Sequence, residues 1–138
     1  MPSRAGPGLV RGRGGELTRG LILFGHGARD PRWAEPFERL AARIRAQTPC
    51  EVRLAYLQFI KPDLQAAAES LIAAGATSIR IVPIFFGQGG HVTGDLTSLI
   101  GRLRERHPGV DLESAVAVGE DAAVIEALAA YCLRSLSA

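Results

Sequence analysis

Short, mostly apolar runs alternate with amphipathic stretches along most of this 138-residue chain. The runs have the length and composition of strands buried on both faces, and the stretches between them repeat apolar residues at intervals of three and four, as on one face of a helix. The runs expected to be strands are 21–24, 52–59, 79–86 and 111–118. The helical stripes are Trp33, Phe37, Leu40 and Ile44; Leu64, Ala67, Ala68, Leu71 and Ile72; Leu96, Leu99, Ile100 and Leu103; and Val124, Ile125, Leu128, Tyr131 and Cys132.

Strands that alternate with helices in this way favour right-handed crossovers and a parallel sheet covered by helices on both faces. We therefore expect an α/β fold, a three-layer sandwich around a small four-stranded parallel sheet in the flavodoxin-like order 2-1-3-4. In that order strands one and three are neighbours, and the chain reverses its winding direction between them. Ligands of such sheets bind beyond the carboxyl ends of the strands at this switch point.

The first 19 residues lack this alternation. They are rich in Gly, Arg and Pro, and their four arginines and one glutamate give a charge of +3, whereas the whole chain carries +2. We expect residues 1–19 to form a flexible basic tail and residues 20–138 to form a single domain. Since the remainder has a charge of −1 (+2 minus +3), it has no basic excess of the kind that nucleic-acid binding requires.

Neither of the two cysteines, Cys50 and Cys132, belongs to a CxxC pair or a zinc-type spacing. Cys132 falls on the last helical stripe, so we expect it in the core. No apolar run approaches the roughly 18 residues that span a membrane, and the N-terminus has no signal-peptide core. These features predict a cytoplasmic protein with no membrane partner.

Two histidines stand among glycines, each just after a predicted strand. His26 follows the first strand in the segment 25–30, and His91 follows the third in the segment 87–91. If these strands are adjacent, the two imidazoles face one crevice, where they can bind a divalent ion such as Co, Ni, Fe or Zn or accept a proton near neutral pH. His107 precedes Pro-Gly at a helix end, where we expect a structural role.

The segments around these histidines carry three motifs. These are residues 23–31 (LFGHGARDP), residues 81–86 with 89–92 (IVPIFF and GGHV) and then Asp95-Leu96, and residues 55–58 (AYLQ) with Pro62 and Leu64. They resemble the short, single-domain sirohydrochlorin cobaltochelatases and the related sirohydrochlorin ferrochelatases and small nickel chelatases. The resemblance covers about residues 20–136.

The resemblance implies an enzyme that inserts a divalent metal into sirohydrochlorin or a related tetrapyrrole of cobalamin or siroheme biosynthesis. The metal would be a substrate, Co²⁺ before Fe²⁺ or Ni²⁺, and no organic cofactor is implied. His26 and His91 would bind the metal and carry the catalysis, and a single-domain chain would form a homodimer that recreates the cleft of longer relatives. The residues expected to contact the tetrapyrrole are Gly27, Ala28, Arg29, Gly89 and Gly90.

Gln58 departs from the family pattern, because many relatives have a Glu at this point, at the end of the second strand. An amide oxygen can still bind a metal, but it has no charge and cannot act as a base. Gln58 is therefore a candidate third ligand of a weaker site. Such a site implies a different metal, help from Asp95 or the partner subunit, or reduced activity. Ala28 replaces a Ser of many relatives, which is a smaller change.

Two other functions stay open. A metal or tetrapyrrole carrier without turnover is somewhat favoured by Gln58. A phosphotransfer protein using His26 is the other, although no arginine precedes this histidine as in phosphohistidine mutases.

Sirohydrochlorin carries many carboxylates, so cationic side chains near the crevice should orient it. The candidates are Arg29, Arg32 and Lys61.

Overall fold

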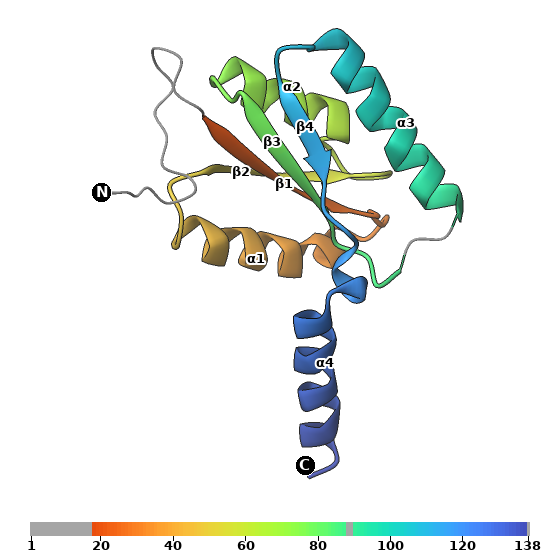
Figure 1. The fold of residues 1–138 in the computed structure, drawn as a ribbon. Helices are drawn as coiled ribbons and strands as arrows, with labels where there is room; N and C mark the ends of the chain where they lie inside the picture. Colours follow the sequence, from red (N-terminus) through yellow and green to blue (C-terminus); the bar gives the residue numbers. More distant parts are fainter. Residues whose placement is uncertain (1–17, 88–89, 138) are drawn as a thin grey trace.

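The computed structural model describes residues 18–87 and 90–137, and of residues 90–93 the backbone alone. Its centre is a parallel sheet in the order β2-β1-β3-β4 (Figure 1). The strands are β1 (Arg19–Gly25), β2 (Glu51–Tyr56), β3 (Ser78–Pro83) and β4 (Asp111–Ser114). The predicted α/β class and strand order are confirmed.

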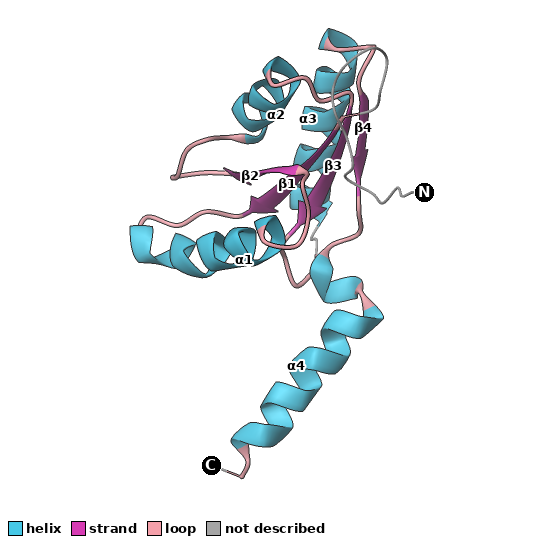
Figure 2. Ribbon diagram, turned by 90° about the vertical axis from the view of Figure 1, so that its left-hand side faces the viewer, coloured by secondary structure: helices cyan, strands magenta, loops and turns pink. Residues whose placement is uncertain are grey.

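Helices follow each strand. Figure 2 shows α1 on one face of the sheet and α2 and α3 on the other, while α4 projects from the body. The helices are α1 (Glu35–Arg45), α2 (Leu64–Ala73), α3 (Gly90–Arg106) and α4 (Ala122–Ser135), with short 3₁₀ turns η1 (Pro31–Ala34) and η2 (Val118–Glu120). Among the described residues, no helix is long and apolar enough to cross a bilayer.

The larger core lies between the sheet and α2 and α3. Alternate strand residues such as Ile22, Ile79 and Ile81 point to this side and are buried. The predicted stripes of both helices meet them there, with Leu64, Ala67, Ala68, Leu71, Leu96, Ile100 and Leu103 all buried. A smaller cluster on the other face joins Leu23 and Val52 of the strands to Ala41 of α1.

The ends of α2 follow the signals in the sequence. The carboxylate of Asp63 accepts a hydrogen bond from the N–H of Ala66 (2.9 Å), which caps the first turn. Gly75, just past the last turn, has φ +104°, a conformation that glycine adopts without strain.

The expected helix from Trp33 is divided. Trp33 lies in η1, which Asp30 caps by accepting from the N–H of Arg32, and α1 begins only at Glu35. Leu40, expected on the buried stripe, is 39% exposed, and its neighbour Ala41 is buried instead. The 3₁₀ turn changes the helical phase after Trp33, so one continuous period does not describe the segment.

Three strands end earlier than predicted. β2 ends at Tyr56, β3 at Pro83 and β4 at Ser114, whereas the apolar runs continue for three or four residues more. Apolar residues beyond the ladders still contribute to the core, as the burial of Phe85 and Ala117 shows. Apolarity therefore reports burial and overestimates strand length.

The amino-terminal end of the body lies slightly before residue 20. Arg19, assigned to the tail by its composition, is the first residue of β1. The N–H of Thr18 donates to Oγ1 of Thr77 (3.1 Å), which ties this end to the start of β3. Residues 1–17, which make up most of the predicted tail, lie outside the described residues.

α4 departs most from expectation. None of its residues is buried. The predicted stripe is present, but Tyr131 is 63% exposed and Cys132 is also exposed. The prediction that Cys132 belongs to the core is wrong for the single chain, because the chain leaves the sheet after β4 and α4 extends away from it (Figure 1).

Candidate metal and tetrapyrrole site

His26 lies at the carboxyl edge of the sheet, directly after β1, and its side chain is exposed. β1 and β3 pair in parallel, and the N–H of Ile84 extends this pairing by donating to the carbonyl of Phe24 (2.8 Å). The loop after β3 therefore starts beside His26. There the ring of Phe85 meets the imidazole edge to face, with centroids 5.4 Å apart. Phe85 is buried, so it supports one side of the imidazole and leaves the rest open.

The loop after β2 lies against the loop that carries His26. The N–H of Gln58 donates to the carbonyl of His26 (3.1 Å). Gly27 has φ +93°, and a Cβ at this residue would collide with the backbone oxygen of Gln58. This contact requires glycine and fixes Gln58 next to His26, although Gln58 lies in a loop beyond β2 rather than at the strand's end. Its side chain is exposed.

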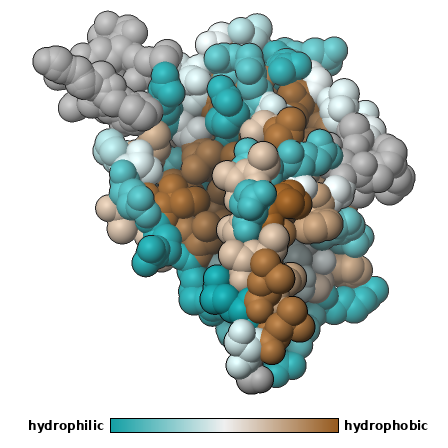
Figure 3. Space-filling model, turned by 60° about the horizontal axis from the view of Figure 1, so that its bottom comes forward, coloured by the Kyte–Doolittle hydropathy of each residue, from teal (hydrophilic) through white to brown (hydrophobic). Residues whose placement is uncertain are grey.

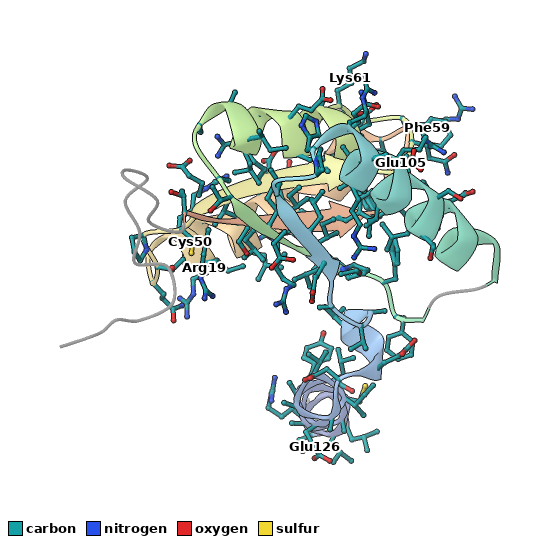
Figure 4. The ribbon with its side chains drawn as sticks, turned by 45° about the horizontal axis from the view of Figure 1, so that its top comes forward. Arg19, Cys50, Phe59, Lys61, Glu105 and Glu126 are labelled. Atoms are coloured by element: carbon teal, nitrogen blue, oxygen red, sulfur yellow. The ribbon has the colours of Figure 1, made fainter. Side chains whose placement is uncertain are left out.

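Arg29 and Phe59 form the outer part of this edge. The guanidinium carbon of Arg29 lies 4.4 Å from the centre of the Phe59 ring, a cation–π contact. This contact holds the guanidinium over the ring, and guanidinium N–H groups can donate to carboxylates. Figure 4 shows Phe59 and Lys61 at the same edge, opposite the edge that carries Arg19 and Cys50.

Arg32 is already engaged. Its guanidinium makes an ion pair with Asp30 (2.7 Å), and these hydrogen bonds lower the pKa of Asp30 from its usual value. The same contact raises the pKa of Arg32. Of the three predicted cations, Arg29 and Lys61 are thus the better placed to meet a carboxylate of a ligand.

An aromatic group supports the edge from the α1 side. Trp33 stacks on Phe37 with ring centres 4.7 Å apart, and both rings contact Tyr56. Gly25, the last residue of β1 and the one before His26, leaves room for the Phe37 ring, which a Cβ would strike. Burial raises the pKa of Tyr56, and the charge of Glu38 raises it further.

His91 lies in a different local structure from the one predicted. The glycine loop was expected to include it, but α3 begins at Gly90 and takes His91 into its first turn. Since β1 and β3 are neighbours, the segments with His26 and His91 leave the sheet at the same edge. The His91 side chain and Gly89 lie outside the described residues, so a shared metal site stays a prediction.

Two shallow hollows flank this edge, with volumes of about 420 and 430 Å³. The first follows the loop from Tyr56 to Asp63 and includes Gln58. The second lies between α2 and α3 and includes Asp95 and Arg102. Neither is lined by His26, so they adjoin the predicted site rather than contain it. Within the described residues, no three His, Cys, Asp or Glu side chains are grouped as a metal site would need.

His107 lies apart from this edge, after α3. Its Nε2 is 3.4 Å from a carboxylate oxygen of Glu69, which links the end of α3 to α2. This contact agrees with the structural role expected for His107.

Sequence reasoning missed the side chains that hold the predicted ones in place. Phe85 and Phe59 belong to apolar or mixed runs that were assigned to strands, so nothing marked them as partners of His26 and Arg29. The feature that could have revealed Phe85 and Phe59 is their position just beyond the last paired residue of a strand, where the strand ends and a loop begins.

Comparisons with known proteins identify the family of the chain. The CbiX family model matches residues 20–134. Proteins named sirohydrochlorin cobaltochelatase are similar: one from Methanocaldococcus jannaschii is 32% identical over 88 residues, 63% of this chain, and one from Saccharolobus solfataricus is 30% identical over 102 residues, covering 71% of this chain and 79% of its own. The match spans 62% of the length of the Methanocaldococcus jannaschii protein.

Solved structures share the fold. The cobalamin (vitamin B12) biosynthesis CbiX protein from Marinobacter aquaeolei superposes with a TM-score of 0.77 and 28% identity, covering 86% of this chain and 98% of that one. The sirohydrochlorin chelatase SirB from Bacillus subtilis, in complex with cobalt, gives a TM-score of 0.68 at 22% identity, covering 76% of this chain and 45% of that one. Together with the family match over almost the whole sheet and its helices, these findings show that the chain belongs to the CbiX family.

Proposed function

We propose that this protein is a chelatase, a lyase that inserts a divalent metal into sirohydrochlorin or a related tetrapyrrole of cobalamin or siroheme biosynthesis. The observation that supports this most is the exposed imidazole of His26, held by Phe85 at the switch point of the sheet. The relatives named sirohydrochlorin cobaltochelatase make Co²⁺ the first candidate metal. The SirB structure with Fe³⁺ supports iron as an alternative. Nickel is a further alternative because imidazole ligands also suit it.

Metal insertion replaces two pyrrole N–H protons by one M²⁺, so the site must deliver a metal and remove two protons. In our proposal His26 and His91 bind the hydrated ion, and at least one of them then relays a proton. The two tasks exclude each other at one nitrogen, because a metal-bound nitrogen cannot accept a proton. Gln58 would contribute an amide oxygen, and Gly27, Ala28, Gly89 and Gly90 would let the flat ring approach the backbone.

Arg29 would orient the tetrapyrrole through its carboxylates, since its guanidinium lies over the ring of Phe59 at the edge of the site. Lys61 would add a second, more mobile contact. The site is open on its outer side, where His26, Gln58 and Arg29 are all exposed. We propose that a second copy closes it in a homodimer, and that the protein works in the cytoplasm.

The test is an insertion assay with purified protein, sirohydrochlorin and Co²⁺, Fe²⁺ or Ni²⁺, followed by absorbance. We expect His26→Ala and His91→Ala each to lower the rate above background by about 100-fold or more, as for the loss of a general acid–base group. His107→Ala is the matched control, because it removes a histidine paired with Glu69 far from the site. If both site variants keep the wild-type rate, the proposed mechanism is wrong.

Gln58 supports a second candidate, a carrier that binds metal or tetrapyrrole without turnover. A neutral amide in place of a carboxylate leaves the site without a base at this position. The same assay separates the two functions, because a carrier binds its ligand stoichiometrically but leaves the insertion rate at background.

A further inference from the structure

One face of the sheet is only half covered. α1 packs over β1 and β2, and its cluster reaches Val82 of β3, but no described helix lies over the rest of this face of β3 or over β4. We call the uncovered part the open strip and define it by Arg80, Glu113 and Ala115. Ile79, Ile81 and Leu112 point into the opposite core, so by strand alternation Arg80 and Glu113 face the open side. Arg80 and Glu113 are in register and exposed, and Ala115 is half-buried.

The helix that would normally cover such a strip is α4. Its stripe, formed by Val124, Ile125, Leu128, Tyr131 and Cys132, lies on one side of the helix but meets no core. Ile125 and Leu128 are 40% and 41% exposed. Figure 3 shows apolar surface both on the projecting helix and on the part of the body beside it. The molecule thus presents an apolar helix face that covers nothing and a sheet face that no described helix covers.

The connection to α4 keeps this helix away from its own strip. Ala117 is fully buried, and residues 118–121 alone join it to α4. Within them the N–H of Gly119 donates to the carbonyl of Phe85 (3.0 Å), and a Cβ on Gly119 would strike the backbone of Phe86. Asp121 then caps α4 by accepting from the N–H of Val124 (3.1 Å). With both ends of this short turn fixed, α4 points outward.

We propose that α4 covers the open strip of a second copy of the chain, so that two copies exchange their last helices. Such an exchange is reciprocal and closes with two-fold symmetry, since each copy offers one helix and one strip. It deepens the homodimer proposed above and rests on that proposal, but it does not depend on the reaction. Net charge does not oppose it, because α4 contains one acid, Glu126, and one base, Arg134, and the strip likewise contains one of each.

The exchange also predicts a specific ion pair. A crossover helix runs antiparallel to its strands, so the C-terminal end of α4 comes to the amino ends of the partner's β3 and β4. Arg134 lies at that end of α4, where its guanidinium is 5.6 Å from the ring centre of Tyr131 in the stripe. Glu113 lies toward the amino end of the strip. In the part of the chain that the structure describes, neither has an ion-pair partner, so Arg134 of one copy would pair with Glu113 of the other.

The first test measures the dimer dissociation constant of the full chain by sedimentation. Glu113→Arg and Arg134→Glu each place like charges at both contacts, so we expect each to weaken the dimer by about tenfold or more. Mixed together, the two variants restore opposite charges at both contacts and should form heterodimers with near wild-type affinity. The double variant Glu113→Arg/Arg134→Glu should also recover.

The mixture distinguishes exchange from folding back. If the double variant recovers and the mixture does not, the contact lies within one chain and the exchange is refuted. It is equally refuted if the wild type stays monomeric at all concentrations, or if neither single variant changes the dimer.

A second pair of variants tests the apolar stripe. Leu128→Asp puts a charge in its centre and should raise the dissociation constant at least about tenfold, whereas Ala130→Asp puts the same charge on the opposite side of α4 and should not. Equal effects would overturn the proposal, and far-UV circular dichroism shows whether both variants keep their helices. An α4-dependent dimer without metal insertion would refute the proposed reaction and leave the exchange standing.

Discussion

Gly27 and Gln58 are in backbone contact, with the Cα of Gly27 facing the carbonyl oxygen of Gln58 and no room for a Cβ between them. The contact joins the loop after β1 to the loop after β2, which are distant in sequence but adjacent in the sheet. The positions of His26 and of the Gln58 backbone therefore depend on each other.

The first prediction follows from this contact. Gly27→Ala adds a Cβ at φ +93° against a fixed oxygen, so we expect the free energy of unfolding to fall by about 1–3 kcal/mol and metal insertion to slow. Urea denaturation and the absorbance assay measure the two effects. Gly101→Ala is the control, because Gly101 lies within α3 with open space around it and alanine should stabilise there by about 0.5–1 kcal/mol. Wild-type stability and activity in Gly27→Ala would contradict the contact.

The second prediction concerns charge at the site. Gln58→Glu places a carboxylate next to His26, and we expect Co²⁺ to bind about 30-fold more tightly, the gain from roughly 2 kcal/mol of attraction between a dication and a carboxylate about 4 Å apart in water. Titration calorimetry with Co²⁺ alone measures this. Gln47→Glu adds the same charge after α1, away from the site, and should leave the affinity unchanged. Equal gains in both variants would mean that net charge, rather than the site, attracts the ion.

The third prediction concerns the support of His26 by Phe85. Phe85→Leu keeps an apolar side chain but removes two ring contacts, with Phe24 and with His26, so stability should fall by about 1–2 kcal/mol. The insertion rate should fall several-fold because the imidazole loses its support. Phe86→Leu is the neighbouring control: Phe86 is 72% exposed, and its loss should change stability by less than about 0.5 kcal/mol. If the Phe86 variant is the slower enzyme, Phe85 does not position His26.

The fourth prediction concerns alkaline pH. Burial raises the pKa of Tyr56 in the folded state, whereas in the unfolded chain this hydroxyl ionises near pH 10. The folded protein then holds the proton longer, so the contribution of Tyr56 to stability is complete below about pH 10 and is lost as pH rises toward the folded-state pKa. Tyr56→Phe should therefore lose less stability than the wild type between about pH 9.5 and 11. Urea denaturation of both proteins across this pH range measures the difference, and equal losses of stability would contradict the prediction.

The strand order could be predicted because the alternation of strands and helices leaves few right-handed arrangements of a four-stranded sheet. The predicted stripes of α2 and α3 were confirmed for the same reason, since each must cover the sheet that its own crossover crosses. The stripe of α4 looked the same in the sequence. Periodicity shows that Leu128 and Tyr131 share a face, but it does not say which sheet that face covers.

The site was predictable in part. His26 stood out because glycines surround it at the end of a buried run, and the neighbouring strands bring the His91 segment to the same edge. The start of α3 at Gly90 was missed because glycine is a poor helix former and the sequence suggested a loop. The contact of Gly27 with Gln58 was missed because it joins two backbones, and backbone contacts leave no pattern in side-chain chemistry.

The edge of the sheet at β4 has a consequence for solubility. An edge strand exposes free N–H and C=O groups on which another chain can add a strand, and repeated addition produces fibres. β4 has only four residues, Asp111–Ser114, and both of its acidic side chains are exposed. So short a strand offers few hydrogen bonds to an added strand, and its two negative charges repel an acidic one. We therefore expect few chains to add at β4, which favours solubility over the formation of open-ended polymers.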